Sequence, residues 1–81
     1  MSPKLPALSG KELVKFLERI GYAVIRQKGS HIRLRKDLKT GQHNITIPMH
    51  KEIAKGTLND ILIKVSLWNN ISKEDLIKSL C

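Results

Sequence analysis

The stretch Gln27–Arg35, with the pair Gly29-Ser30 near its start, restricts the fold of this chain more than any other part of the sequence. On either side of this pair lies a run in which apolar and polar residues alternate, Tyr22–Arg26 before it and His31–Lys36 after it. Two alternating runs joined by a short turn that contains glycine are typical of a β-hairpin. The sequence therefore predicts an antiparallel strand pair in this region.

The two faces of the second strand differ in chemistry. Because successive side chains of a strand point to opposite faces of the sheet, His31, Arg33 and Arg35 share one face, and Ile32 and Leu34 share the other. Histidine exchanges protons near neutral pH, and arginine binds phosphate through a planar fork of donors. This pattern indicates chemistry on a phosphate backbone, or binding to one.

The charge of the chain supports this interpretation. Fifteen Lys and Arg against seven Asp and Glu give a net charge of +8. Six of these bases and one acid lie between Arg26 and Lys39, so this segment alone carries a net charge of +5. Such an excess favours a polyanionic partner: nucleic acid, an acidic protein or an anionic membrane surface.

Length and cysteine content limit the remaining possibilities. We expect one domain over residues 1–81, with residues 1–8 as a flexible arm, because 81 residues suit a single small core. The single cysteine, Cys81, allows no disulfide framework and fits the cytoplasm. No apolar run is long enough to span a membrane.

The three histidines are 12 and 7 residues apart, which fits no metal motif, so we expect no metal or cofactor.

The other segments predict an α+β fold. A capping box at Ser9 and Glu12 opens a first helix, and Gly21 ends it. A third strand over His43–Ile47 stops at Pro48. A second helix opens at Thr57, and a short third helix follows Ser72. The order α-β-β-β-α, plus a short C-terminal helix, is that of the double-stranded-RNA-binding domain (dsRBD), with three antiparallel strands and the helices on one face.

Several residues outside the hairpin are candidates for function. Lys51 and Lys55 flank the predicted helix start at Thr57, where free N–H groups and the positive helix end favour a phosphate. We expect His43 to lie on the surface. We expect Trp68 to fill the core at the end of the second helix, or to contact a partner if it is exposed.

Four motifs of this chain, in the same order and at the same spacing, resemble the HicA-type mRNA interferase toxins, also called the YcfA-like family. The similarity extends from about Ser9 to Leu62, and the chain departs from the family pattern at Ile32 and over residues 65–72. The motifs are Glu12–Gly21, Arg26–His31, Ile45–His50 and Lys55–Leu58 followed by Ile61-Leu62.

The resemblance implies a dsRBD-like fold and metal-independent cleavage of single-stranded mRNA by the toxin of a type II toxin–antitoxin system, inhibited by an acidic HicB-type antitoxin. The histidine of the family's Gly-Ser-His motif, here His31, would be catalytic. His50 follows the family's Pro-x-His pattern and is a candidate second acid or base. The residues expected to bind RNA are Arg26, Lys28, Gly29, Ser30, Arg33, Arg35, Lys51, Lys55 and Thr57.

Two other functions fit the same residues. A non-catalytic RNA-binding module of dsRBD-like fold would have the same topology and the same basic helix start. An interaction protein whose basic face meets only an acidic partner would show no affinity for RNA at low salt. Incubation with labelled RNA in EDTA separates these alternatives from a nuclease.

Overall fold

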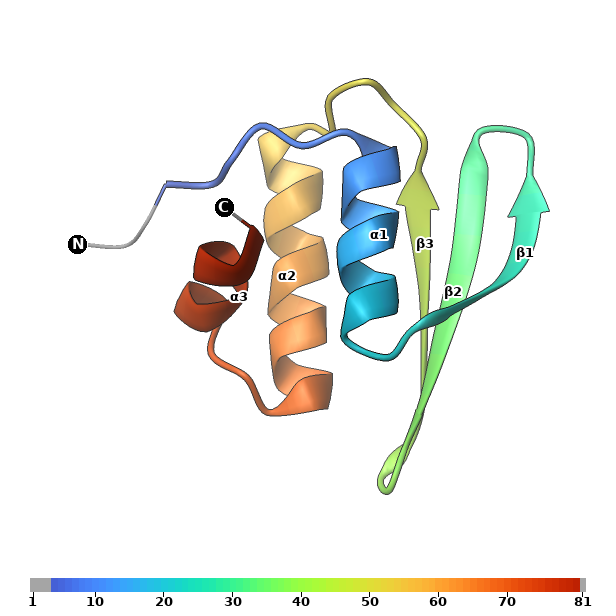
Figure 1. Cartoon of the computed structure of the whole chain (residues 1–81), viewed down its shortest axis with the longest axis vertical. Coiled ribbons are helices and arrows are strands. Elements are labelled where there is room, and N and C mark those ends of the chain that lie inside the picture. The colour runs from blue at the N-terminus through green and yellow to red at the C-terminus, as the bar shows by residue number, and fades with distance from the viewer. Residues whose placement is uncertain (1–3, 81) are drawn as a thin grey trace. The chain divides into compact units, whose positions relative to one another are not determined.

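The computed structural model describes residues 4–80 and confirms the predicted α+β class (Figure 1). Contacts divide the chain into two compact units: Leu8–Ile53, and Ala54–Cys81 together with Met1–Ala7. That the whole chain forms one domain stays a prediction. The elements in order are α1 (Gly10–Arg19), β1 (Ala23–Lys28), β2 (His31–Leu38), β3 (Gly41–Pro48), α2 (Lys55–Asn69) and α3 (Lys73–Leu80).

The first helix, α1, begins at the predicted capping box. The Ser9 hydroxyl accepts from the Glu12 backbone N–H at 3.0 Å, and the Glu12 carboxylate accepts from the Ser9 backbone N–H at 3.0 Å. Hydrogen bonds to the Glu12 carboxylate, from the Ser9 backbone N–H first and from the Ser9 hydroxyl second, hold the pKa of Glu12 below its usual range. The helix is followed by Gly21 with φ +106°, a conformation that favours glycine.

The sheet is antiparallel in the order β1-β2-β3, so β2 is the central strand. Its apolar residues Ile32 and Leu34 are buried, as the alternation predicted, and so are Ile45 and Ile47 beside them on β3. The helix α1 lies against this sheet and buries its own apolar stripe in the same unit (Figure 1). Full burial of each such side chain contributes about 1.5–3 kcal/mol, so this layer is the main source of stability of the unit.

A β-bulge divides β1 into two parts. Val24 pairs with Leu34 and Arg26 pairs with Arg33, which leaves Ile25 as an extra residue without a partner on β2. One extra residue reverses the side-chain alternation along a strand. The bulge therefore allows Val24 to share the face of Leu34 while Arg26 points to the opposite face with Arg33.

His43 corrects a prediction. We expected it on the surface, but it is only 5% exposed, and its Nδ1 lies 2.5 Å from the hydroxyl of the equally buried Tyr22. The two rings meet edge to face, with their centroids 5.6 Å apart. The Tyr22 hydroxyl is thus a polar partner inside the core, which explains why β3 can bury an imidazole here.

Three segments of the first unit are tied together by backbone hydrogen bonds. The Met49 N–H donates to the Ser30 carbonyl at 2.6 Å, and the Gly10 N–H donates to the His50 carbonyl at 2.9 Å. The Ile53 N–H donates to the carbonyl of Leu8, which is buried. The start of α1 and the loop after β3 therefore hold the carbonyl of the β1–β2 turn in place.

Gly10 is required where α1 meets this loop. An added Cβ would lie 2.2 Å from the Pro48 carbonyl oxygen and 2.8 Å from the Met49 Cα. We expect Gly10→Ala to lower the free energy of unfolding by about 1–3 kcal/mol, because backbone atoms must shift to admit the methyl group. Gly56→Ala is the matched control, since nothing lies within 4 Å of its added Cβ. Urea denaturation of both variants checks this, and equal stabilities would contradict it.

In the second unit, α2 begins earlier than the predicted helix. It begins at Lys55, two residues before Thr57, and Ala54 caps it without a side-chain hydrogen bond. It continues to Asn69 and ends where Asn70 adopts φ +54°. The prediction of Thr57 as the opening residue is therefore wrong, because the helix starts at Lys55 without needing a capping side chain.

The remaining features of this unit follow the sequence more closely. The apolar stripe of α2 is buried at Leu58, Ile61, Leu62 and Val65. The Ser72 hydroxyl accepts from the Asp75 N–H at 3.1 Å and caps α3 as predicted.

Trp68 is 38% exposed, so it does not fill a core. Within residues 4–80 no helix is long and apolar enough to cross a membrane.

Candidate functional site: a basic cavity on the sheet

The residues of the candidate site form rows across the solvent face of the sheet. Cross-strand partners share a face, so each row can be followed from the strand pairing. The row nearest the β1–β2 turn contains Lys28, His31 and Pro48. The next row contains Arg26, Arg33 and Thr46, and the one after it contains Ala23, Arg35 and Asn44.

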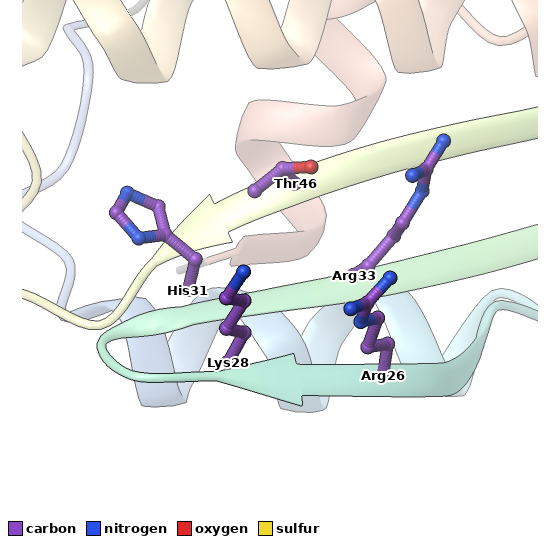
Figure 2. A pocket seen from close by; sticks show the side chains of 5 residues that line it. All are labelled: Arg26, Lys28, His31, Arg33 and Thr46. Carbon is purple, nitrogen blue, oxygen red and sulfur yellow. The ribbon is translucent and has the colours of Figure 1, made fainter.

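The first two rows enclose a shallow cavity of about 210 Å³. It is lined by Arg26, Lys28, His31, Arg33 and Thr46. Figure 2 shows their side chains rising from the same side of the three strands. The lining contains three bases, an imidazole and a hydroxyl, but no carboxylate. Its charge therefore suits an anion.

His31 occupies the first position of β2, immediately after the turn. Gly29 has φ +58°, a positive value of the kind that two-residue hairpin turns require at their first central residue. The Ser30 carbonyl is fixed by the Met49 N–H. A tight turn on one side and a paired strand on the other thus set the direction in which the exposed imidazole points.

Arg35 shares the solvent face, as predicted, but does not line the cavity. Its Nε donates to the Asn44 Oδ1 at 3.3 Å in the third row. The turn residues Gly29 and Ser30 also lie outside the lining. Their contribution to the site is to position His31 through the backbone. The structure therefore brings together four of the predicted side chains: His31, Arg26, Lys28 and Arg33.

The other predicted site residues lie elsewhere in the chain. His50 and Lys51 are exposed in the loop after β3, and His50 is absent from the cavity lining. Lys55 is the first residue of α2, and Thr57 lies in its first turn, in the other compact unit. Both are exposed, and the first turn of α2 contains no acidic residue. The first turn of α2 therefore carries no negative charge that would repel a phosphate.

Sequence reasoning missed Thr46. Its place between two buried isoleucines, Ile45 and Ile47, already indicated that it points to the opposite face. What the sequence did not indicate was its row, because that depends on the register between β2 and β3. Among residues 4–80 there is no cluster of three His, Cys, Asp or Glu that could hold a metal ion.

Fold and site together define a small basic α+β protein with an exposed histidine among basic side chains. A family model described as the HicA toxin of bacterial toxin–antitoxin systems matches residues 10–67, more than half of the chain. The chain therefore belongs to the HicA toxin family, as its four motifs predicted, and family membership implies an antitoxin partner. Neither the curated proteins nor the solved structures contain a match.

Proposed function

We propose that this toxin is an endoribonuclease that cleaves single-stranded mRNA in the cytoplasm, with His31 as its catalytic residue. The observation that carries this proposal is the cavity in which an exposed imidazole stands beside three bases and a hydroxyl. Imidazole and cations are the groups that RNA cleavage without a metal ion requires. The lining has no carboxylate to bind a divalent cation.

The reaction follows from these groups. His31 removes the proton of a ribose 2′-hydroxyl, the 2′-oxygen attacks the adjacent phosphorus, and the bond from phosphorus to the 5′-oxygen breaks. Cations in the lining stabilise the charge that develops on the phosphate. Protonated His31, or His50 as a second acid, supplies the proton to the leaving 5′-oxygen. The products are a 2′,3′-cyclic phosphate and a free 5′-hydroxyl.

The antitoxin partner is of the HicB type in this proposal. An acidic surface that covers the cavity would neutralise Lys28, Arg26 and Arg33 and block access to His31. Inhibition then needs no change in the fold of the toxin.

Incubation of the purified chain with labelled single-stranded RNA in EDTA tests the proposal. We expect fragments that end in a 2′,3′-cyclic phosphate. Bound but intact RNA would instead identify a non-catalytic RNA-binding module. Absence of RNA affinity at low salt would identify a protein that meets only an acidic partner.

Binding of RNA should weaken steeply with salt. If the bases that line the cavity neutralise two phosphates, log K should fall with log salt at a slope of about −1.4, or about 7-fold between 50 and 200 mM. Fluorescence anisotropy with a labelled, non-cleavable oligonucleotide measures the slope. An affinity that does not change with salt would rule out these phosphate contacts.

The predicted phosphate site at the start of α2 has its own test. We expect Lys51→Ala combined with Lys55→Ala to raise KM and leave kcat nearly unchanged, because these lysines position phosphate and transfer no proton. Steady-state cleavage kinetics measure both constants. A collapse of kcat would instead place this segment in the reaction centre and make His50 the acid.

A further inference from the structure

The cavity contains two rows of different chemistry, and each is suited to a separate phosphate. The row nearest the turn offers an imidazole and an ammonium group, from His31 and Lys28. The next row offers two guanidinium groups and a hydroxyl, from Arg26, Arg33 and Thr46. Only the first row can transfer a proton near neutral pH, because arginine stays charged in proteins.

The second row is an unfavourable arrangement in the absence of an anion. Arg26 and Arg33 are direct cross-strand partners, and like charges opposite each other destabilise a sheet. No carboxylate lines the cavity to separate them. Their neighbour Arg35, in contrast, already donates to the Asn44 side chain. An anion with several oxygens, such as a phosphate, would satisfy both guanidinium groups at once.

The bulge in β1 serves this arrangement. Tyr22 is buried, whereas Arg26 and Lys28 line the cavity on the opposite face. Regular alternation would place even-numbered residues of one strand on one face. The extra residue Ile25 reverses the alternation between them. Bulges that re-aim side chains in this way are common beside active sites.

The spacing of the rows fits successive phosphates of one RNA strand. His31 and Arg33 are two residues apart on β2, which corresponds to roughly 6.6 Å along a strand. This is comparable to the distance between neighbouring phosphates of an extended single strand. A scissile phosphate at the first row thus places the next phosphate at the second.

From these observations we infer that Arg26, Arg33 and Thr46 form a subsite for the phosphate next to the scissile one. The subsite rests on the proposed function and extends it: the toxin needs two consecutive phosphates and anchors its substrate on one side of the cleaved bond. The arginines are then binding and positioning residues, and the chemistry stays with the first row.

Binding of short probes tests the subsite without any need for cleavage. The probes are a dinucleotide with a 2′-deoxy group at the scissile position, the same dinucleotide with a 5′-phosphate, and the same with a 3′-phosphate. NMR titration of the wild-type chain gives the three dissociation constants. We expect one of the two terminal phosphates to tighten binding by about 10- to 100-fold, as charge-assisted hydrogen bonds do.

Variants then assign the gain to the second row. Arg26→Gln with Arg33→Gln should abolish the gain, so that the three probes bind this variant with the same affinity, and Thr46→Val should reduce the gain. Lys11→Gln with Lys15→Gln is the control of equal charge change, since both lysines are exposed on α1 outside the cavity. Arg26→Lys with Arg33→Lys keeps the charge and guards against loss of the fold. This lysine variant should lose most of the affinity that the terminal phosphate adds, because lysine lacks the planar fork of donors.

The outcomes separate this inference from the proposed function. The subsite is excluded if neither terminal phosphate matters, if both contribute equally, or if either double variant keeps the full gain. The nuclease proposal is tested separately, by cleavage of long RNA. Intact long RNA combined with the expected probe binding would leave the subsite standing as part of an RNA-binding module.

Discussion

His31→Ala should lower the rate of RNA cleavage by about 10²–10⁴-fold, the usual cost of losing a proton-transfer group. His31→Gln should do no better, because glutamine can hydrogen-bond but cannot shuttle a proton at neutral pH. The imidazole is exposed on the solvent face, so the free energy of unfolding of both variants should lie within about 0.5 kcal/mol of the wild-type value. Growth arrest on expression should disappear while soluble protein accumulates.

Cleavage assays and thermal melts of the two variants, beside Lys15→Gln, provide the measurement. Near-normal cleavage by either variant would exclude His31 as the catalytic residue. A pair of variants that melt like the wild type but do not cleave would assign the chemistry to His31. If the alanine variant melts early, the glutamine variant decides, because it retains most of the side-chain volume.

Leu34→Ala should cause the largest loss of stability among the substitutions considered. Leu34 is fully buried on the central strand, between two residues of the basic face. Removal of such a side chain costs about 2–5 kcal/mol through lost burial and the cavity left behind. For a domain of this size the melting temperature should fall by about 10 °C or more.

Leu67→Ala provides a matched control for this substitution. It makes the same chemical change in the same chain, but Leu67 is 76% exposed, and its loss should change stability by no more than about 0.5 kcal/mol. Chemical denaturation of both variants gives the comparison. Equal effects would mean that the sheet face bearing Leu34 is not the core.

Most of the fold followed from local patterns in the sequence. The capping box at Ser9 and Glu12, the turn at Gly29 and the alternation through Ile32 and Leu34 each depend on residues close in the chain. The same alternation placed His31 and Arg33 on one face. Local patterns therefore predicted the catalytic candidate and three of the four residues that line the cavity with it, all but Thr46.

The remaining features depend on contacts between distant residues. His43 looked like a surface residue because its partner, Tyr22, lies 21 positions away. Thr46 joined the site through the register with Arg33. The helix α2 starts at Lys55 without a capping side chain, so no residue in the sequence marks this start. A register or a distant hydrogen bond leaves no periodic signal in the sequence, so these features could not be predicted from it.

The unpaired Ile25 also has a consequence for how chain length can vary. Its deletion would leave Val24 opposite Leu34 and Arg26 opposite Arg33, so both halves of β1 would keep their faces. Loss of Gln27 would instead shift Arg26 to the opposite face relative to Lys28. Natural relatives should therefore tolerate a one-residue gap at position 25 and show none at position 27.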